Sequence, residues 1–131
     1  MKIAVVVADF YPDIAEALLE SCRAEAEGHD MDIMRVPGAL EIPFALKIVA
    51  EQKKPDAMVA LGCVIRGETY HFQTVSDMCA RGILQVQMQT NIPIGSGVLT
   101  VENMMQATAR TGKGADAARA AITLAKLAKG T

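Results

Sequence analysis

The stretch Lys2-Ile3-Ala4-Val5-Val6-Val7-Ala8 decides the fold. It is a continuous apolar run rich in β-branched residues, which is typical of a strand that is covered on both faces in a parallel sheet. The pattern returns at 56–64, Asp-Ala-Met-Val-Ala-Leu-Gly-Cys-Val. Since only helices cover both faces of such strands, the two runs predict an α/β fold.

Helical patterns follow each expected strand. After Pro12, apolar residues recur at Ile14, Leu18 and Cys22, which is the spacing of a helix that ends at Gly28. Gly82 is a weak point in the third helix but not necessarily its end. Strands are expected at 2–8, 32–36, 56–64 and 93–100, and helices at 12–27, 42–52, 71–87 and 115–129. A further helix is expected to start from a cap at Thr100, with Glu102 in its first turn, and to end at about Arg110.

Strands that alternate with helices at this spacing pair in parallel through right-handed crossovers. We therefore expect a three-layer αβα sandwich that forms one domain over residues 1–131. Ligands of such sheets bind beyond the carboxyl ends of the strands. Here those ends are 9–11, 37–41, 64–71 and 96–100.

Length and composition exclude several classes of protein. The chain has 131 residues, of which 51% are hydrophobic, and a formal net charge of −2. This is enough to bury a core and argues against disorder. The charge balance lacks the basic patch that nucleic-acid binding requires. No apolar run approaches the roughly 20 residues of a membrane span, and the start MKIAVVVADFYP lacks a cleavage signal, so we expect a cytoplasmic protein with its native N-terminus.

The cysteines and histidines give no metal pattern. Cys22, Cys63 and Cys79 form no CxxC pair, and an odd number suits reduced thiols buried in the core. His29 lies in a polar turn and is expected to be solvated surface. We expect no metal site.

The segment 62–72, Gly-Cys-Val-Ile-Arg-Gly-Glu-Thr-Tyr-His-Phe, joins a buried strand to a helix. Free backbone N–H groups and a positive helix end meet there, which is an anion site in outline. The alternative is an ordinary loop with Gly67 at a turn and Thr69 as a cap, and the pattern does not choose. A P-loop is excluded because GxxxxGK[ST] is absent.

His71 lies in the expected first turn of that helix, where the helix dipole disfavours the charged imidazolium. A neutral ring there can accept a proton, which makes His71 the best acid–base candidate. Taken alone, such a histidine is more often a capping or partly buried structural residue.

Three other positions carry two interpretations each. Glu41 faces either a ligand pocket or the backbone donors of its own helix, and Pro43 favours the latter. Phe10, beside Tyr11, either stacks on a flat ligand or belongs to the core, and the pattern alone favours the core. Arg110 and Lys113 flank a helix break, where they either neutralise a phosphate or complement the negative helix end.

Three motifs together closely resemble lumazine synthase: VPGALEIPFAL at 36–46, LGCVIRGETYHF at 61–72, and GVLTVEN with QATAR at 97–110. The resemblance covers nearly the whole chain. It implies a flavodoxin-like fold with a four-stranded parallel sheet, a pentameric ring and active sites between adjacent subunits. It also implies condensation of 5-amino-6-(D-ribitylamino)uracil with 3,4-dihydroxy-2-butanone 4-phosphate in riboflavin biosynthesis, with no metal or organic cofactor.

The resemblance also assigns roles by motif. It implies that Phe10 stacks on the pyrimidine ring, that Val64 and Ile65 contact the heterocycle, and that His71 shuttles protons. It further implies that Ala39, Leu40 and Glu41 hold the ribityl chain and that Lys113 lies near the ring. The residues that it implies for phosphate binding are Gly67, Glu68, Thr69 and the neighbouring subunit's Arg110. These assignments outweigh the structural alternatives above.

The chain departs from the family at two positions that bear on ring binding. Tyr11 stands where Asn is frequent, and Ser96 stands where an aromatic residue often faces the adjacent subunit's pocket. These changes raise the alternative of a non-catalytic flavin- or lumazine-binding oligomer. An archaeal-type riboflavin synthase is a further alternative, against which the loop at 61–72 argues. Because the first strand starts at Lys2, we expect a pentamer or a pair of pentamers rather than a larger shell.

Overall fold

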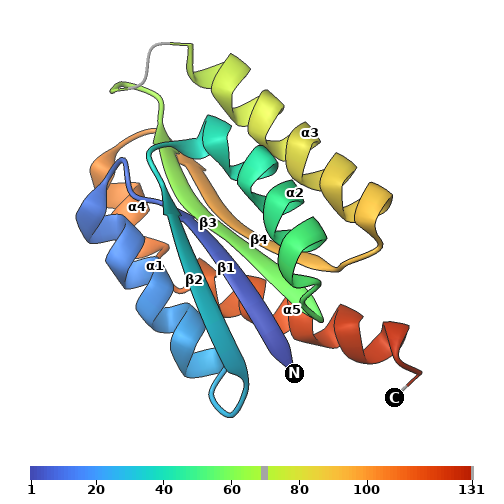
Figure 1. Ribbon diagram of the computed structural model, residues 1–131. Coiled ribbons are helices and arrows are strands. Elements are labelled where there is room, and N and C mark those ends of the chain that lie inside the picture. Colours follow the sequence, from blue (N-terminus) through green and yellow to red (C-terminus); the bar gives the residue numbers. More distant parts are fainter. Residues whose placement is uncertain (69–70, 131) are drawn as a thin grey trace.

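The computed structural model describes residues 1–68 and 71–130 and has four parallel strands in one sheet (Figure 1). The order across the sheet is β2-β1-β3-β4, so that β1 and β3 are central. The strands are β1 (Lys2–Ala8), β2 (Asp30–Val36), β3 (Ala57–Ile65) and β4 (Ile94–Val101). The predicted four-stranded parallel sheet is confirmed.

Helices cover both faces of this sheet, as the predicted sandwich requires. In Figure 1, α1 and α5 lie on one face, and α2 and α3 lie on the other. The helical elements are α1 (Pro12–Glu25), the 3-10 turn η1 (Ala39–Glu41), α2 (Ile42–Lys53), α3 (Phe72–Thr90), α4 (Met104–Ala109) and α5 (Lys113–Ala128).

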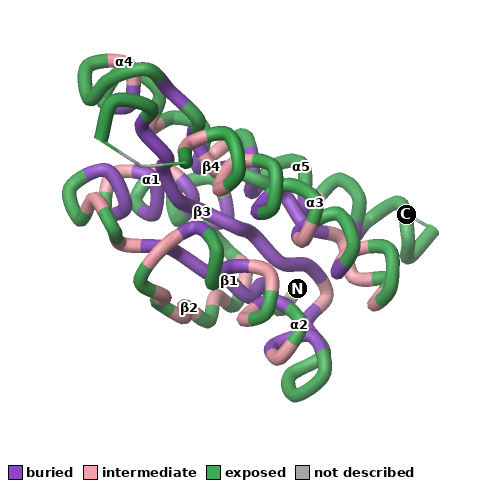
Figure 2. Tube along the Cα trace, turned by 90° about the horizontal axis from the view of Figure 1, so that it is seen from above, coloured by how far each residue is buried: buried purple, intermediate pink, exposed green. Residues whose placement is uncertain are grey.

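The two central strands are buried on both faces, which explains their continuous apolar sequence. Figure 2 shows the buried colour running along β3 through the middle of the molecule. Because side chains alternate across a strand, β1 and β3 supply both cores. Val5 and Val59 belong to the core under α1 and α5, while Val6 and Met58 belong to the core under α2 and α3.

The parallel register brings the carboxyl ends of the strands to one edge. Ala8 of β1 pairs with Val36 of β2, and Ile65 of β3 pairs with Val101 of β4. The segments that follow all four strands therefore lie at this edge, at the upper end of Figure 1. This is where the sequence predicts ligand binding.

The predicted boundaries of two helices are wrong for local reasons. Thr100 does not cap a helix, since β4 continues to Val101 and Glu102 precedes the helix. Asn103 is the cap, because its side-chain oxygen accepts from the Gln106 N–H at 2.9 Å. The third helix begins at Phe72, one residue after His71, and continues to Thr90 rather than 87.

Gly82 lets α3 approach α2 closely instead of ending it. A Cβ at Gly82 would lie 2.5 Å from Cγ of Pro43, so only glycine fits there.

His29 also differs from its prediction. It is half-buried, and its Nδ1 lies 3.0 Å from the Met1 amino nitrogen.

We expect Gly95→Ala to destabilise the fold strongly. Its Cβ would lie 1.8 Å from the Ala117 carbonyl oxygen, so β4 and α5 would have to separate. Overpacking of this kind lowers the free energy of unfolding by about 3 kcal/mol. Urea denaturation measures the change.

Gly112→Ala is the matched control. A Cβ at Gly112 meets nothing within 4 Å, and the backbone there is already helical (φ −62°), so stability should change by less than about 0.5 kcal/mol. Equal urea midpoints for the two variants would contradict the close approach of β4 and α5.

Candidate active site

A cavity of about 320 Å³ opens at the carboxyl edge of the sheet. It lies between the segment after β1, the segment after β2 and the end of β3. Five residues selected from the sequence line it, namely Phe10, Ala39, Leu40, Glu41 and Val64. Pro37, Gly38, Cys63 and Val75 complete the lining. Its size and mixed apolar and carboxylate walls suit part of a small organic ligand.

Phe10 is 58% exposed, so the core interpretation favoured by its sequence pattern is wrong. Its ring stacks on that of Tyr11, with centroids 4.9 Å apart and an angle of 21° between the planes. Tyr11 thus covers one face of the Phe10 ring. A flat ligand in the cavity can stack only on the other face.

Glu41 caps α2 with its backbone and not with its side chain. The structure has no side-chain hydrogen bond from Glu41 to the first turn of α2, although Glu41 stands at the N-cap position. A Cβ at Gly38 would lie only 3.1 Å from the Glu41 Oε1, so the carboxylate folds back over the glycine. This arrangement leaves the carboxylate available to a ligand's hydroxyl groups, and it removes the helix-capping interpretation.

Val64 and Ile65, at the end of β3, face opposite layers. Val64 lines the cavity and belongs to the core under α2 and α3. Ile65 is 1% exposed and packs in the core under α1 and α5. Its side chain is therefore not among those that line the cavity.

Two backbone N–H groups of the turn after β3 already donate hydrogen bonds within the protein. The Arg66 N–H donates to the Val101 carbonyl oxygen at 2.9 Å, and the Glu68 N–H donates to the Ile65 carbonyl oxygen at 3.2 Å. An anion held here would have to share the Glu68 N–H with that carbonyl. Gly67 is exposed, and Thr69 lies outside the described residues.

His71 stands at the cap position of α3 rather than in its first turn. It is exposed and has a left-handed backbone (φ 63°), an uncommon conformation for a residue other than glycine. Its carbonyl oxygen accepts from the Val75 N–H at 3.0 Å, which starts the helix. Val75 also lines the cavity, so the histidine and the cavity belong to the same end of α3.

Arg110 and Lys113 line a second groove and not the first cavity. This groove, of about 570 Å³, runs along the end of β4 and the break between α4 and α5. Ser96 is exposed on β4 and lines neither space. Five predicted site residues therefore line the first cavity, while Arg110 and Lys113 line a separate groove.

The three cysteines are free and buried, as predicted. Burial raises the pKa of each thiol to about 11, and the Glu68 carboxylate adds to this effect at Cys63. Cys63 is the one that lines the cavity. Its raised pKa keeps a neutral, weakly polar thiol facing a ligand at neutral pH.

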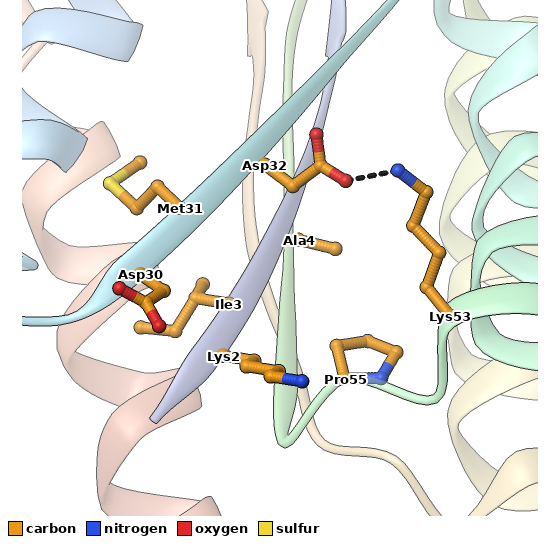
Figure 3. Close-up of a pocket in the computed structure, with 8 residues that line it drawn as sticks. All are labelled: Lys2, Ile3, Ala4, Asp30, Met31, Asp32, Lys53 and Pro55. Carbon is orange, nitrogen blue, oxygen red and sulfur yellow. Dashed lines mark hydrogen bonds and ion pairs between the residues drawn. The ribbon is translucent and has the colours of Figure 1, made fainter.

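A third cavity, of about 410 Å³, lies at the opposite end of the sheet, near the starts of β1 and β2 (Figure 3). Its acidic and basic side chains neutralise each other in part, since Lys53 pairs with Asp32. None of the predicted site residues lines it. Across residues 1–68 and 71–130, no group of three or more His, Cys, Asp and Glu side chains could hold a metal ion, and no helix has the length and apolarity of a membrane span.

Comparison with known proteins bears on the whole chain. The sequence model of the 6,7-dimethyl-8-ribityllumazine synthase family matches residues 1–129. The chain belongs to this family. Curated relatives with that name include proteins from Paracidovorax citrulli, 47% identical over 97% of this chain and 86% of the relative, and from Cupriavidus necator, 48% identical over 97% and 80%. The resemblance read from the three motifs is thus confirmed.

Lumazine synthases are transferases of riboflavin biosynthesis, and the alternatives raised at Tyr11 and Ser96 are not favoured. Sequence analysis placed Pro37 and Gly38 at the ligand-binding edge without giving them a role, and it did not select Cys63 or Val75. Cys63 was detectable in principle, because it stands two residues before the end of a buried strand. Val75 was not, because its position depends on how α3 crosses the sheet.

We expect Cys63 to react slowly with iodoacetamide although it lines the cavity. The thiolate is the nucleophile, and with a pKa near 11 the thiol keeps its proton at about pH 8. The labelling rate should rise as pH approaches that pKa. Peptide mass spectrometry measures it, with urea-unfolded protein as the control. Labelling that is as fast in the folded as in the unfolded chain would contradict the raised pKa.

Proposed function

We propose that this lumazine synthase family member condenses 5-amino-6-(D-ribitylamino)uracil with 3,4-dihydroxy-2-butanone 4-phosphate. The products are 6,7-dimethyl-8-ribityllumazine, inorganic phosphate and water. One observation carries the proposal: the cavity that joins Phe10, Glu41 and Val64 at the carboxyl edge of the sheet. Membership of the 6,7-dimethyl-8-ribityllumazine synthase family supports the reaction.

The first cavity binds the ribitylaminouracil. The pyrimidine stacks on the open face of Phe10, whose other face Tyr11 covers. Ala39, Leu40 and Glu41 hold the ribityl chain. The Glu41 carboxylate accepts hydrogen bonds from the ribityl hydroxyl groups, because it is not used to cap α2. At the end of β3, Val64 contacts the heterocycle, while Ile65, whose side chain is buried in the opposite core, offers only its backbone.

The turn after β3 binds the phosphate of the second substrate. Gly67, Glu68 and Thr69 supply donors, and Arg110 of the adjacent subunit pairs with the dianion. Ser96 and Lys113 approach the ring from that same subunit. Negative charge builds at this end as phosphate leaves, so positive groups fixed in place lower the barrier.

His71 moves protons between the two substrates. The primary amine of the uracil attacks the ketone and a first water leaves. Phosphate then departs, and the ribityl-bearing nitrogen attacks the remaining carbonyl carbon, so that the ring closes as a second water leaves. Each step transfers a proton, which the imidazole of His71 accepts and returns. Holding two reactants in register supplies much of the remaining acceleration.

The active subunit arrangement is a pentamer or a pair of pentamers. Two features support an assembly. The predicted site residues of one chain line two separate spaces, which a neighbouring copy would bring together. Large apolar side chains are also exposed on α2 and α3, at Phe44, Met78, Leu84 and Met88. Exposed apolar surface of this extent is common at interfaces between subunits. Native mass measurement gives the subunit count.

The protein forms one domain and acts in the cytoplasm without a metal or organic cofactor. Three free, buried thiols support a reducing compartment.

Mixing the purified protein with both substrates should give the absorbance of the lumazine and release inorganic phosphate. Riboflavin formed from added lumazine would instead support a riboflavin synthase. Tight flavin binding without either product would support a binding protein and contradict the proposed reaction.

We expect His71→Ala and Arg110→Ala subunits to complement each other. Loss of the proton carrier slows turnover by about 100-fold or more, and loss of Arg110 mainly raises KM for the phosphate-bearing substrate. If each site takes His71 and Arg110 from different subunits of a ring, equal mixing of the two variants leaves about a quarter of the sites intact. The measurement is the activity of jointly refolded variants.

Each variant refolded alone is the control. Activity of the mixture that is no greater than the mean of the two variants would contradict a shared site, and an unchanged rate in His71→Ala would remove His71 from the mechanism.

A further inference from the structure

We propose that Arg66 is a positioning residue that keeps the Glu102 carboxylate from competing with phosphate for Arg110. This inference rests on the proposed function. It concerns an ion pair within the subunit that contributes Arg110, to which neither the three motifs nor the family resemblance assigned a role.

Arg66 has two side-chain partners, of which Glu102 is distant in the sequence. Its Nε donates to Oε2 of Glu102 at 2.6 Å, and its guanidinium carbon lies 4.5 Å from the centre of the Phe72 ring. Phe72 is the first residue of α3, and Glu102 follows β4. Arg66 therefore links the residue after His71 to the turn that leads to Arg110.

The backbone fixes this pairing in register. The Arg66 N–H donates to the Val101 carbonyl oxygen, which places residue 66 next to residue 102 across the end of the sheet. The Glu102 N–H is held in turn by the side-chain oxygen of Gln106 at 2.8 Å. The two charged side chains thus start from fixed positions and need little ordering to meet.

Glu102 and Arg110 line the same groove, of about 540 Å³, together with Arg66 and Phe72. Among the described residues, Arg110 makes no ion pair or side-chain hydrogen bond, whereas Glu102 is paired with Arg66. Asp77 is the other acid in the groove, and the Gln73 amide donates to it at 3.0 Å. Arg66 is therefore the cation that engages the Glu102 carboxylate and leaves Arg110 free.

Removing Arg66 would release an unpaired carboxylate into this groove. Glu102 would then attract the Arg110 guanidinium and repel a phosphate dianion, since both interactions follow from charge alone. Both side chains of the Arg66 and Glu102 pair are more than half exposed, so solvent screening limits the size of the effect.

Four variants test this inference: Arg66→Met, Glu102→Gln, the double variant, and Arg35→Met as a matched control. Arg35 makes an exposed ion pair with Glu16, also at 2.6 Å, far from the groove. The measurements are KM for each substrate, kcat, and inhibition by inorganic phosphate. Urea midpoints check that every variant is folded.

We expect Arg66→Met to raise KM for the phosphate-bearing substrate, and the inhibition constant of inorganic phosphate, by about fivefold. KM for ribitylaminouracil should not change. Glu102→Gln should bind phosphate at least as well as the unmodified protein. In the double variant both constants should return to their original values, because the competing carboxylate is gone. Arg35→Met should change neither constant.

Two results would overturn the inference. If phosphate binding in the double variant is as weak as in Arg66→Met, Arg66 acts on the phosphate directly or through the fold. If Arg66→Met binds phosphate normally, Arg66 has no positioning role. Phosphorus NMR measures the binding of inorganic phosphate without any turnover. Both outcomes can therefore be tested even if the unmodified protein makes no lumazine. Absence of lumazine would contradict only the proposed reaction.

Discussion

Burial of β1 and β3 on both faces is the constraint on which the rest of the structure depends. Each of these strands supplies alternate side chains to two cores. Separation of either helical layer from the sheet would therefore expose apolar surface to water. The parallel register that follows from this burial sends all four strands toward one edge. Residues as distant in sequence as Phe10 and Val75 meet there for that reason.

The fold was predictable because its decisive signal is local. Continuous apolar runs and helical spacing are properties of neighbouring residues, and they gave the right elements in the right order. Boundaries were less predictable where several polar residues could cap a helix. Thr100 and Asn103 are both good caps, and the choice between them depends on how far β4 stays paired with β3.

The candidate site was only partly predictable, since it depends on side-chain directions at the ends of strands. Sequence pattern placed Phe10 in the core, but the strand ends at Ala8 and the ring projects outward beside Tyr11. To predict that the Glu41 carboxylate folds back over Gly38, one needs the position of Gly38 in space, and no periodicity in the sequence gives it. The pairing of Arg66 with Glu102 could be predicted only with the knowledge that β3 and β4 are neighbours in the sheet.

The stacked rings of Phe10 and Tyr11 also give the protein an optical property. The chain contains no tryptophan and two tyrosines, so its intrinsic ultraviolet emission comes from tyrosine. Tyr11 stacks on the residue that lines the cavity, and Tyr70 directly precedes His71 in the sequence. Both emitters thus belong to segments of the candidate site, so quenching of this fluorescence by an aromatic ligand would follow occupancy of the site without any attached dye.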